Sequence, residues 1–226
     1  MNINYKNQYL GYKNIYLYYK KSILLNRQNG GKNNNKTKNN NKIKNNNKKI
    51  VVFDFDYTLS KYDLSTEVAM NIGIMDDMDF TIRNVLKFRD YLSPLFRNKE
   101  FINFLKKTKS DNVKYYIVSY GLHDMIDYVI KENNFDDIFT DIYTSKIFDL
   151  EENHEFVDLL DGKNRFFKKI MREENMTDKK NILFFDDNPK NYEKAILGGY
   201  NAVKVNPNTG LTMKNFKDIK EFLGKN

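Results

Sequence analysis

The chain has 226 residues and no cysteine, which excludes disulfide bonds and thiolate metal sites. About 40% of its residues are hydrophobic, enough for one domain with its own core. The net charge of +8 comes from the first 50 residues, which hold 12 Lys and Arg and no acidic residue. The remaining residues hold 26 basic and 30 acidic side chains, so the overall basic charge does not indicate a nucleic-acid-binding catalytic domain.

The first 49 residues differ in composition from the rest of the chain. Residues 29–49 are almost entirely Asn, Lys and Gly, and such a segment buries too little apolar surface to offset the entropy of ordering. We therefore interpret residues 1–49 as a disordered basic extension. Tyr and Leu in residues 1–28 leave an organelle-targeting role open, although transit peptides usually contain more Arg and Ser. We expect a cytoplasmic protein without a transmembrane segment, because no apolar stretch is long enough to span a bilayer.

From residue 50 onward, short apolar runs alternate with amphipathic stretches. This alternation indicates an α/β protein with a Rossmann-like parallel sheet and helices on both faces. The predicted strands are residues 50–55, 113–118, 138–143, 181–185 and 201–205. The predicted helices are residues 98–109, 122–133, 164–175, 190–197 and 215–223.

The segment between the first two strands is too long for a simple connection. It includes a predicted helix near residues 80–92. We interpret residues 60–97 as a flap or minimal helical lid, because the segment is too short for an independent domain of ordinary size. The predicted catalytic domain therefore covers residues 50–226 and carries this insert.

Polar side chains follow three of the predicted strands. Asp54 and Asp56 end the first strand, Ser119 ends the second, and Asp186 and Asp187 end the fourth. Open parallel sheets bind ligands beyond the carboxyl ends of their strands. Strand alternation also predicts that Asp54 and Asp56 share one side. These side chains are therefore expected to meet at one edge of the sheet.

Four motifs in chain order resemble those of the haloacid dehalogenase-like (HAD) phosphatase superfamily. They are Asp54-Phe55-Asp56-Tyr57-Thr58-Leu59, Val118-Ser119-Tyr120-Gly121, Gly162-Lys163-Asn164 and Phe184-Phe185-Asp186-Asp187-Asn188-Pro189. The resemblance covers about residues 50–210, and four ordered motifs are more specific than one Asp-x-Asp pair. The acidic pair of the last motif and the large residue Tyr57 are most similar to capless or minimal-cap magnesium-dependent members.

The resemblance implies a phosphomonoester hydrolase that works through an aspartyl-phosphate. Asp54 would attack phosphorus, and Asp56 would protonate the leaving group and then deprotonate water. Thr58, Ser119 and Lys163 would bind the phosphoryl oxygens. An Asp two residues after the nucleophile resembles the phosphatases rather than the dehalogenases of this superfamily.

The carboxylates at the strand ends indicate a magnesium site. Several ionised carboxylates beside a phosphate need positive charge, and Mg²⁺ is a hard cation that prefers oxygen ligands. We assign to it the carboxylates of Asp54 and Asp186 and the backbone carbonyl of Asp56. Asp187 is either a ligand through water or an anchor for Lys163. The alternatives to Lys163 as the motif lysine are Lys146, Lys168 and Lys169.

The substrate is left open between a phosphoprotein and a small phosphorylated metabolite. A second hypothesis is a non-catalytic module that binds a phosphate or a partner on the same fold. A third is a nucleic-acid-associated end-phosphatase, in which Lys and Tyr of residues 1–49 contact phosphates and bases. We rank the third hypothesis last, and the oligomeric state is left open.

Overall fold

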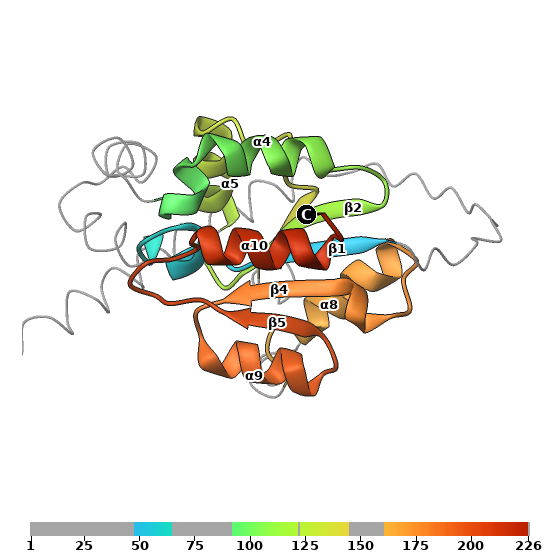
Figure 1. Ribbon diagram of the computed structural model, residues 1–226. Helices are drawn as coiled ribbons and strands as arrows, with labels where there is room; N and C mark the ends of the chain where they lie inside the picture. The colour runs from blue at the N-terminus through green and yellow to red at the C-terminus, as the bar shows by residue number, and fades with distance from the viewer. Residues whose placement is uncertain (1–47, 65–91, 122, 145–160, 226) are drawn as a thin grey trace, which may run out of the picture. The chain divides into compact units, whose positions relative to one another are not determined.

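The computed structural model describes residues 48–64, 92–121, 123–144 and 161–225. Five strands form one parallel sheet in the order β3-β2-β1-β4-β5 (Figure 1). The predicted α/β, Rossmann-like class is thereby confirmed. The strands are β1 (Lys49–Phe53), β2 (Val113–Ser119), β3 (Asp141–Thr144), β4 (Ile182–Asp186) and β5 (Asn201–Lys204).

Helices cover both faces of this sheet (Figure 1). The α-helices are α4 (Lys99–Thr108), α5 (His123–Glu132), α8 (Asn164–Glu173), α9 (Pro189–Leu197) and α10 (Met213–Phe222). The shorter helical turns are η1 (Phe55–Leu59), η2 (Pro94–Arg97) and η3 (Lys179–Asn181). No helix among the described residues is both long and apolar enough to cross a membrane.

One face of the sheet packs through phenylalanine rings. Phe53 of β1 stacks on Phe185 of β4 at 5.5 Å and meets Phe96 of η2 edge-to-face at 5.8 Å between ring centroids. On the same side, Phe101 of α4 contacts Phe216 of α10 at 5.2 Å. Offset and edge-to-face pairs of this kind add to the stabilisation from burying apolar area. Helices α4 and α10 therefore close this face.

The opposite face packs mainly against α8. Val52 of β1 and Phe184 of β4 belong to one buried cluster with Phe166, Phe167 and Ile170 of α8. Successive strand residues point to opposite faces, so a strand covered on both sides must be apolar throughout. The nearly continuous apolar sequences of β1 and β4 satisfy this requirement.

The strand order reverses at β1. From β1 the chain goes to β2 and then β3 on one side, and it returns to β4 and β5 on the other. The Asp54 amide still donates to the Phe185 carbonyl at 2.8 Å, which fixes the ends of β1 and β4 side by side. Such a reversal is the switch point at which open α/β sheets bind ligands.

Most predicted boundaries agree with the structure to within two residues, but the third strand differs. The predicted strand 138–143 is replaced by β3 at Asp141–Thr144. Ile138 and Phe139 are buried in the preceding loop, where the Phe139 ring lies 6.2 Å from that of Phe53. Their apolar character serves loop packing, which periodicity cannot distinguish from a strand.

Part of the predicted insert 60–97 is described. Ser60 and Leu92 form an antiparallel bridge, so these two residues lie side by side. The predicted helix near residues 80–92 lies outside the described residues apart from Leu92. The predicted disordered extension 1–49 also lies outside them apart from Lys48, which pairs with Glu174, and Lys49, which begins β1 and so belongs to the domain. The domain limits at both places therefore stay predictions.

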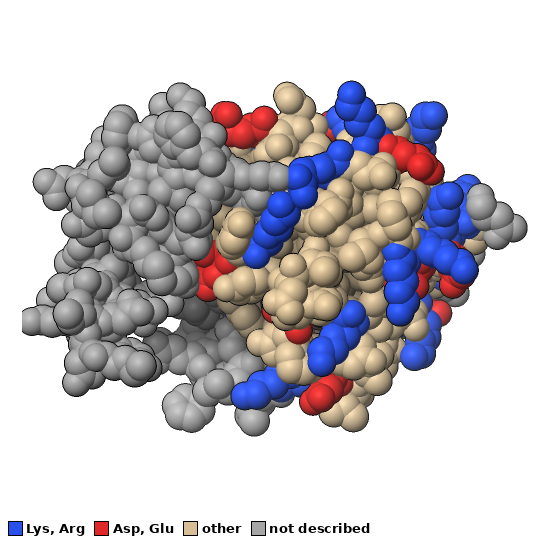
Figure 2. All heavy atoms as spheres, turned by 60° about the vertical axis from the view of Figure 1, so that its left-hand side comes forward, with Lys and Arg blue, Asp and Glu red and all other residues tan. Residues whose placement is uncertain are grey.

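Charged side chains are spread over the described surface. On the face drawn in Figure 2, basic side chains are separated by uncharged and acidic residues. No continuous basic patch forms on the described part of this face. This surface therefore adds nothing to the hypothesis of nucleic-acid binding.

Candidate active site

The chain turns sharply after β1. Asp54 is still extended, with φ −69° and ψ 161°, and its carboxylate accepts a hydrogen bond from the Phe55 amide at 2.7 Å. Residues 55–59 then form a wide turn, in which Asp56 and Tyr57 have non-helical backbone angles. The Ser60 amide closes this turn by donating to the Phe55 carbonyl at 2.9 Å. Asp56 therefore belongs to a turn, so the strand alternation used to predict its direction does not apply there.

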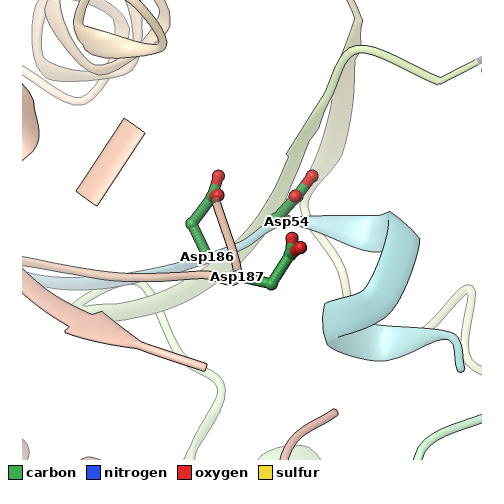
Figure 3. A group of neighbouring side chains, drawn as sticks. All are labelled: Asp54, Asp186 and Asp187. Atoms are coloured by element: carbon green, nitrogen blue, oxygen red, sulfur yellow. The ribbon is translucent and has the colours of Figure 1, made fainter. Parts of the chain in front are cut away.

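Three carboxylates gather at the ends of β1 and β4. Oxygen atoms of Asp54, Asp186 and Asp187 all lie within 4.8 Å of one another (Figure 3). Asp54 and Asp186 are buried, whereas Asp187 is partly exposed. The gathering occurs at the switch point because the two strands are paired neighbours.

Lys163 enters this group from the start of α8. Its side chain is almost fully buried, and its Nζ lies 2.6 Å from Asp54 Oδ1 and 2.7 Å from Asp186 Oδ2. Burial alone would lower the pKa of Lys163, but the two carboxylates outweigh burial and raise it. Lys163 is therefore a charged ammonium in the centre of the group.

The alternative lysines lie elsewhere. Lys168 and Lys169 belong to α8, and their side chains are exposed and partly exposed, respectively. The Lys168 Nζ lies 2.6 Å from a carboxylate oxygen of Asp161, and the Lys169 Nζ lies 3.8 Å from one of Glu173. Lys146 lies outside the described residues. Among the described candidates, the geometry supports Lys163.

The Asp186 carboxylate is held by groups that follow it in the chain. The Asn188 amide donates to Asp186 Oδ1 at 2.8 Å, and Asn191 Nδ2 lies 3.3 and 3.2 Å from its two oxygens. No motif in the sequence marks Asn191. Its position in the first turn of α9 is the signal that could identify it, because the helix start faces the strand end.

Asp56 is held by the backbone on the far side of the turn. Its Oδ1 accepts a hydrogen bond from the Leu64 amide at 3.0 Å. Burial, together with the neighbouring Asp63 carboxylate, raises the pKa of Asp56 to about 7. A carboxyl group with such a pKa can both donate and accept a proton near neutral pH.

Ser119 and Asp56 meet around Gly121. The Ser119 hydroxyl oxygen accepts a hydrogen bond from the Gly121 amide at 3.0 Å. A Cβ atom at Gly121 would lie 2.9 Å from Asp56 Oδ2 and 3.2 Å from Ser119 Oγ. The loops after β1 and β2 therefore adjoin, and only a residue without a side chain fits between them undisturbed.

Thr58 lies in the turn after β1. Its side chain is fully buried, and its hydroxyl has no hydrogen-bond partner among the described residues. Its carbonyl accepts from the Leu211 amide at 3.1 Å, so the backbone here is fixed. Of the seven predicted side chains, Asp54, Lys163, Asp186 and Asp187 form one group, and Asp56 and Ser119 meet around Gly121.

The group carries an excess of negative charge. Lys163 faces the carboxylates of Asp54 and Asp186, with Asp187 beside them. Burial raises the pKa of Asp54, and Lys163 opposes that rise. A cluster of hard oxygen donors with surplus charge fits a divalent cation such as Mg²⁺, which would favour the ionised carboxylates.

No protein-family model matches the chain, and no curated protein matches it. Solved structures do. The HAD domain of the effector protein Lem4 from Legionella pneumophila is 19% identical, with a TM-score of 0.51 over 78% of this chain and 95% of that one. A HAD-superfamily hydrolase from Ehrlichia chaffeensis is 16% identical, with a TM-score of 0.48 over 79% and 97% of the two chains.

The likeness to the Lem4 domain spans most of both chains and agrees with the five-stranded parallel sheet. The chain therefore has the fold of the HAD superfamily. The resemblance seen in the four sequence motifs is confirmed at the level of the fold. The capless or minimal-cap subtype stays a prediction.

Proposed function

We propose that the protein is a Mg²⁺-dependent phosphomonoester hydrolase with Asp54 as nucleophile. The observation that carries this proposal is the position of the Asp54 carboxylate at the switch point. It forms an ion pair with the Lys163 ammonium and lies close to the carboxylates of Asp186 and Asp187. This arrangement provides a nucleophile, a cation and metal-ligating oxygens within one buried site.

In the first step, an Asp54 oxygen attacks phosphorus, and the bond from phosphorus to the ester oxygen breaks. Asp56, which can be protonated near neutral pH, donates its proton to the leaving oxygen. The products of this step are the free alcohol and an aspartyl-phosphate on Asp54. Proton donation of this kind contributes roughly 10²–10⁴-fold in rate.

In the second step, the ionised Asp56 removes a proton from water. The water oxygen attacks phosphorus, and the bond to Asp54 breaks. Inorganic phosphate leaves, and Asp54 and Asp56 return to their starting states. The hydrogen bond from the Leu64 amide holds the Asp56 carboxylate in position for both proton transfers.

Asp54, Asp186 and Asp187 would hold Mg²⁺, together with the backbone carbonyl of Asp56. The bound cation would neutralise charge on the phosphoryl oxygens and on the surrounding carboxylates. The three carboxylates lie close enough together to share one ion. Asn188 and Asn191 orient the Asp186 carboxylate through the hydrogen bonds given above.

Lys163, Ser119 and Thr58 would bind the non-bridging phosphoryl oxygens. The Lys163 ammonium is within 2.6 Å of the attacking carboxylate, so it lies beside the site of the incoming phosphoryl group. The Ser119 hydroxyl still has its proton to donate, because its oxygen acts as acceptor for Gly121. The buried Thr58 hydroxyl has no hydrogen-bond partner among the described residues. These donors act where negative charge develops in the transition state.

The test uses the full chain, para-nitrophenyl phosphate and Mg²⁺. We expect turnover that stops when the metal is chelated, and a loss of at least about 10³-fold on Asp54→Asn. Asp136→Asn, at an exposed loop aspartate, is the matched control and keeps wild-type activity. Unchanged activity of Asp54→Asn would contradict the proposal.

The same variants distinguish the non-catalytic alternative. A binding module would retain a phosphorylated ligand with measurable affinity and release no phosphate with any divalent metal. The enzyme proposed here releases phosphate in a time-dependent reaction. Calorimetric binding and phosphate release, measured on one preparation, therefore separate the two functions.

A further inference from the structure

Exposed tyrosines gather next to the proposed site. Six large hydrophobic side chains are exposed among the described residues, and three of them are tyrosines in the loops that follow β1 and β2. The six are Tyr57, Tyr62, Tyr120, Ile196, Leu197 and Met213. Single exposed hydrophobic residues are common on protein surfaces, so the position of a residue matters more than its exposure. Tyr57 directly follows Asp56, and Tyr120 directly follows Ser119.

Tyr120 lies against the ammonium of the site. Lys163 Nζ is 5.3 Å from the centroid of the Tyr120 ring, and the same atom is 2.6 Å from Asp54 Oδ1. The ring is nevertheless 43% exposed. One part of the ring therefore covers Lys163, while the remainder is accessible beside the position of the phosphoryl group.

Tyr57 is held in an unusual backbone conformation. Its φ of +56° lies in the left-handed region, where glycine is favoured and an aromatic residue is uncommon. Its side chain is 39% exposed, so burial of the ring does not explain the residue. The Tyr57 ring is therefore accessible to solvent directly after Asp56 in the chain.

The two tyrosine-bearing loops adjoin. A Cβ at Gly121 would lie 2.9 Å from Asp56 Oδ2, so the residue after Tyr120 touches the residue before Tyr57. Tyr120 thus lies against Lys163, and Tyr57 follows Asp56 on the adjoining loop. We call Tyr57 and Tyr120 the tyrosine pair.

We propose that the tyrosine pair selects phosphomonoesters whose leaving group carries a planar aromatic ring close to the ester oxygen. This inference rests on the proposed phosphatase activity and names its substrate class. Aromatic rings prefer offset-stacked or edge-to-face contact with other rings, and each such contact contributes roughly two- to tenfold in affinity. The pair adjoins Asp56 and Lys163, so it contacts groups attached to the phosphate rather than distant parts of a substrate.

The test compares two esters of matched size and leaving-group type, benzyl phosphate and cyclohexylmethyl phosphate. They differ in the planarity and aromatic character of the ring. We expect the wild-type full chain with Mg²⁺ to prefer benzyl phosphate by roughly tenfold in kcat/KM. Tyr57→Leu and Tyr120→Leu should each reduce this ratio, and the double variant should bring it close to one.

Control variants separate recognition from a general structural effect. Tyr57→Phe keeps the ring and should keep the preference. Tyr128→Leu replaces a partly exposed tyrosine on α5 and should leave the ratio unchanged. The ratio is insensitive to the fraction of folded enzyme, because both esters are measured on the same preparation. A wild-type ratio near one, or a ratio unchanged in both Leu variants, would overturn the inference.

A binding measurement keeps this inference separate from the phosphatase proposal. Calorimetry on the Asp54→Asn variant with Mg²⁺ should show benzyl phosphate binding roughly tenfold more tightly than its cyclohexyl counterpart. Equal binding would overturn the inference and leave the phosphatase proposal standing. The variant could instead bind benzyl phosphate preferentially while the wild type turns over neither ester. That result would support ring selection by the tyrosine pair and contradict the proposed phosphatase activity.

The aromatic group can belong to a free small molecule or to a phosphorylated tyrosine side chain. Both share the same ring chemistry beside the phosphate. Phenyl phosphate and a tyrosine-phosphorylated tetrapeptide, compared at equal Mg²⁺, distinguish the two sources. A higher kcat/KM for the peptide would indicate contacts beyond the ring, and a similar value would assign selectivity to the tyrosine pair alone.

Discussion

Helix α8 is flanked by a buried charged residue at each end. One of them is a cation among carboxylates, and the other is an anion among lysines. At its start, the cation Lys163 faces the carboxylates of Asp54 and Asp186. At its end, the anion Glu174 faces two cations, with Lys48 at 2.6 Å and Lys114 at 2.7 Å.

Both residues oppose the dipole of the helix. The start of a helix carries partial positive charge and disfavours lysine, and its end disfavours glutamate. Each must therefore be stabilised by its partners. The Glu174 carboxylate also accepts a hydrogen bond from the Tyr116 hydroxyl at 2.7 Å, so it has three donors.

The difference between the clusters distinguishes a structural role from a functional one. Glu174 has enough partners to satisfy its charge and joins α8 to the starts of β1 and β2. The Lys163 cluster keeps a surplus of carboxylates, which a divalent cation can neutralise. We therefore expect changes at Glu174 to affect stability and changes around Lys163 to affect activity.

The largest expected effect comes from Lys163→Met. Removing the ammonium should lower kcat/KM by about 10³-fold or more, because it takes away a cation beside the phosphoryl group. It also leaves buried carboxylates without their partner, which costs about 3–5 kcal/mol of stability in metal-free protein. Lys168→Met, at the surface pair with Asp161, is the matched control. Steady-state kinetics and thermal unfolding measure both effects, and activity within threefold of wild type would contradict the account.

Glu174→Gln should have the opposite pattern. We expect a loss of roughly 2–3 kcal/mol in the free energy of unfolding, because two lysines lose their carboxylate in a buried setting. The folded variant should keep wild-type kcat/KM. Urea unfolding gives the stability, and Glu132→Gln at the exposed end of α5 serves as the control. If kcat/KM falls although the variant is fully folded, the claim that the Glu174 cluster affects stability alone would be wrong.

Acid should remove the stability that the Glu174 cluster contributes in the wild-type protein. Although burial alone would raise it, hydrogen bonds from Lys114, Lys48 and Tyr116 lower the pKa of Glu174 to about 2. A folded-state pKa below the unfolded value gives stability that is complete above about pH 5 and lost as pH falls toward 2. Between pH 7 and pH 3 the wild type should lose about 2 kcal/mol more than Glu174→Gln. Equal losses in urea titrations of the two proteins would show that Glu174 is not the group responsible.

Gly121→Ala should give the smallest effect and should act on activity alone. The added Cβ would lie 2.9 Å from Asp56 Oδ2, and the carboxylate can move away at little structural cost. Displacing the acid–base group should lower kcat by about tenfold, since general acid–base catalysis depends on position. Gly224→Ala is the control for activity: nothing lies within 4 Å of the added atom, whereas its φ of +65° predicts some loss of stability in that variant. If kcat stays unchanged while thermal unfolding shifts, Asp56 is not positioned at this contact.

The sequence predicts the sheet and the main site well, because both produce recognisable patterns within short stretches of the chain. Continuous apolar runs mark strands buried on both faces, and polar residues mark the strand ends. Asp54, Lys163 and Asp186 are found in this way and lie together in the structure.

The rest depends on packing between distant parts of the chain. Glu174 meets Lys48 across 126 residues of sequence, and no local pattern predicts that contact. Likewise, Gly121 fits against Asp56 only because the loops after β1 and β2 adjoin. Ile138 and Phe139 were predicted as strand residues because loop packing can require the same apolar side chains as a strand.

The most direct test of the central claim is to trap the phosphorylated protein. The full chain is mixed with para-nitrophenyl phosphate and Mg²⁺, quenched in acid during turnover, digested, and analysed by mass spectrometry. We predict a phosphoryl group on the peptide that contains Asp54, labile to hydroxylamine and absent from Asp54→Asn. Turnover with the phosphoryl group on another residue, or with Asp54→Asn equally active, would contradict the assignment of Asp54 as nucleophile.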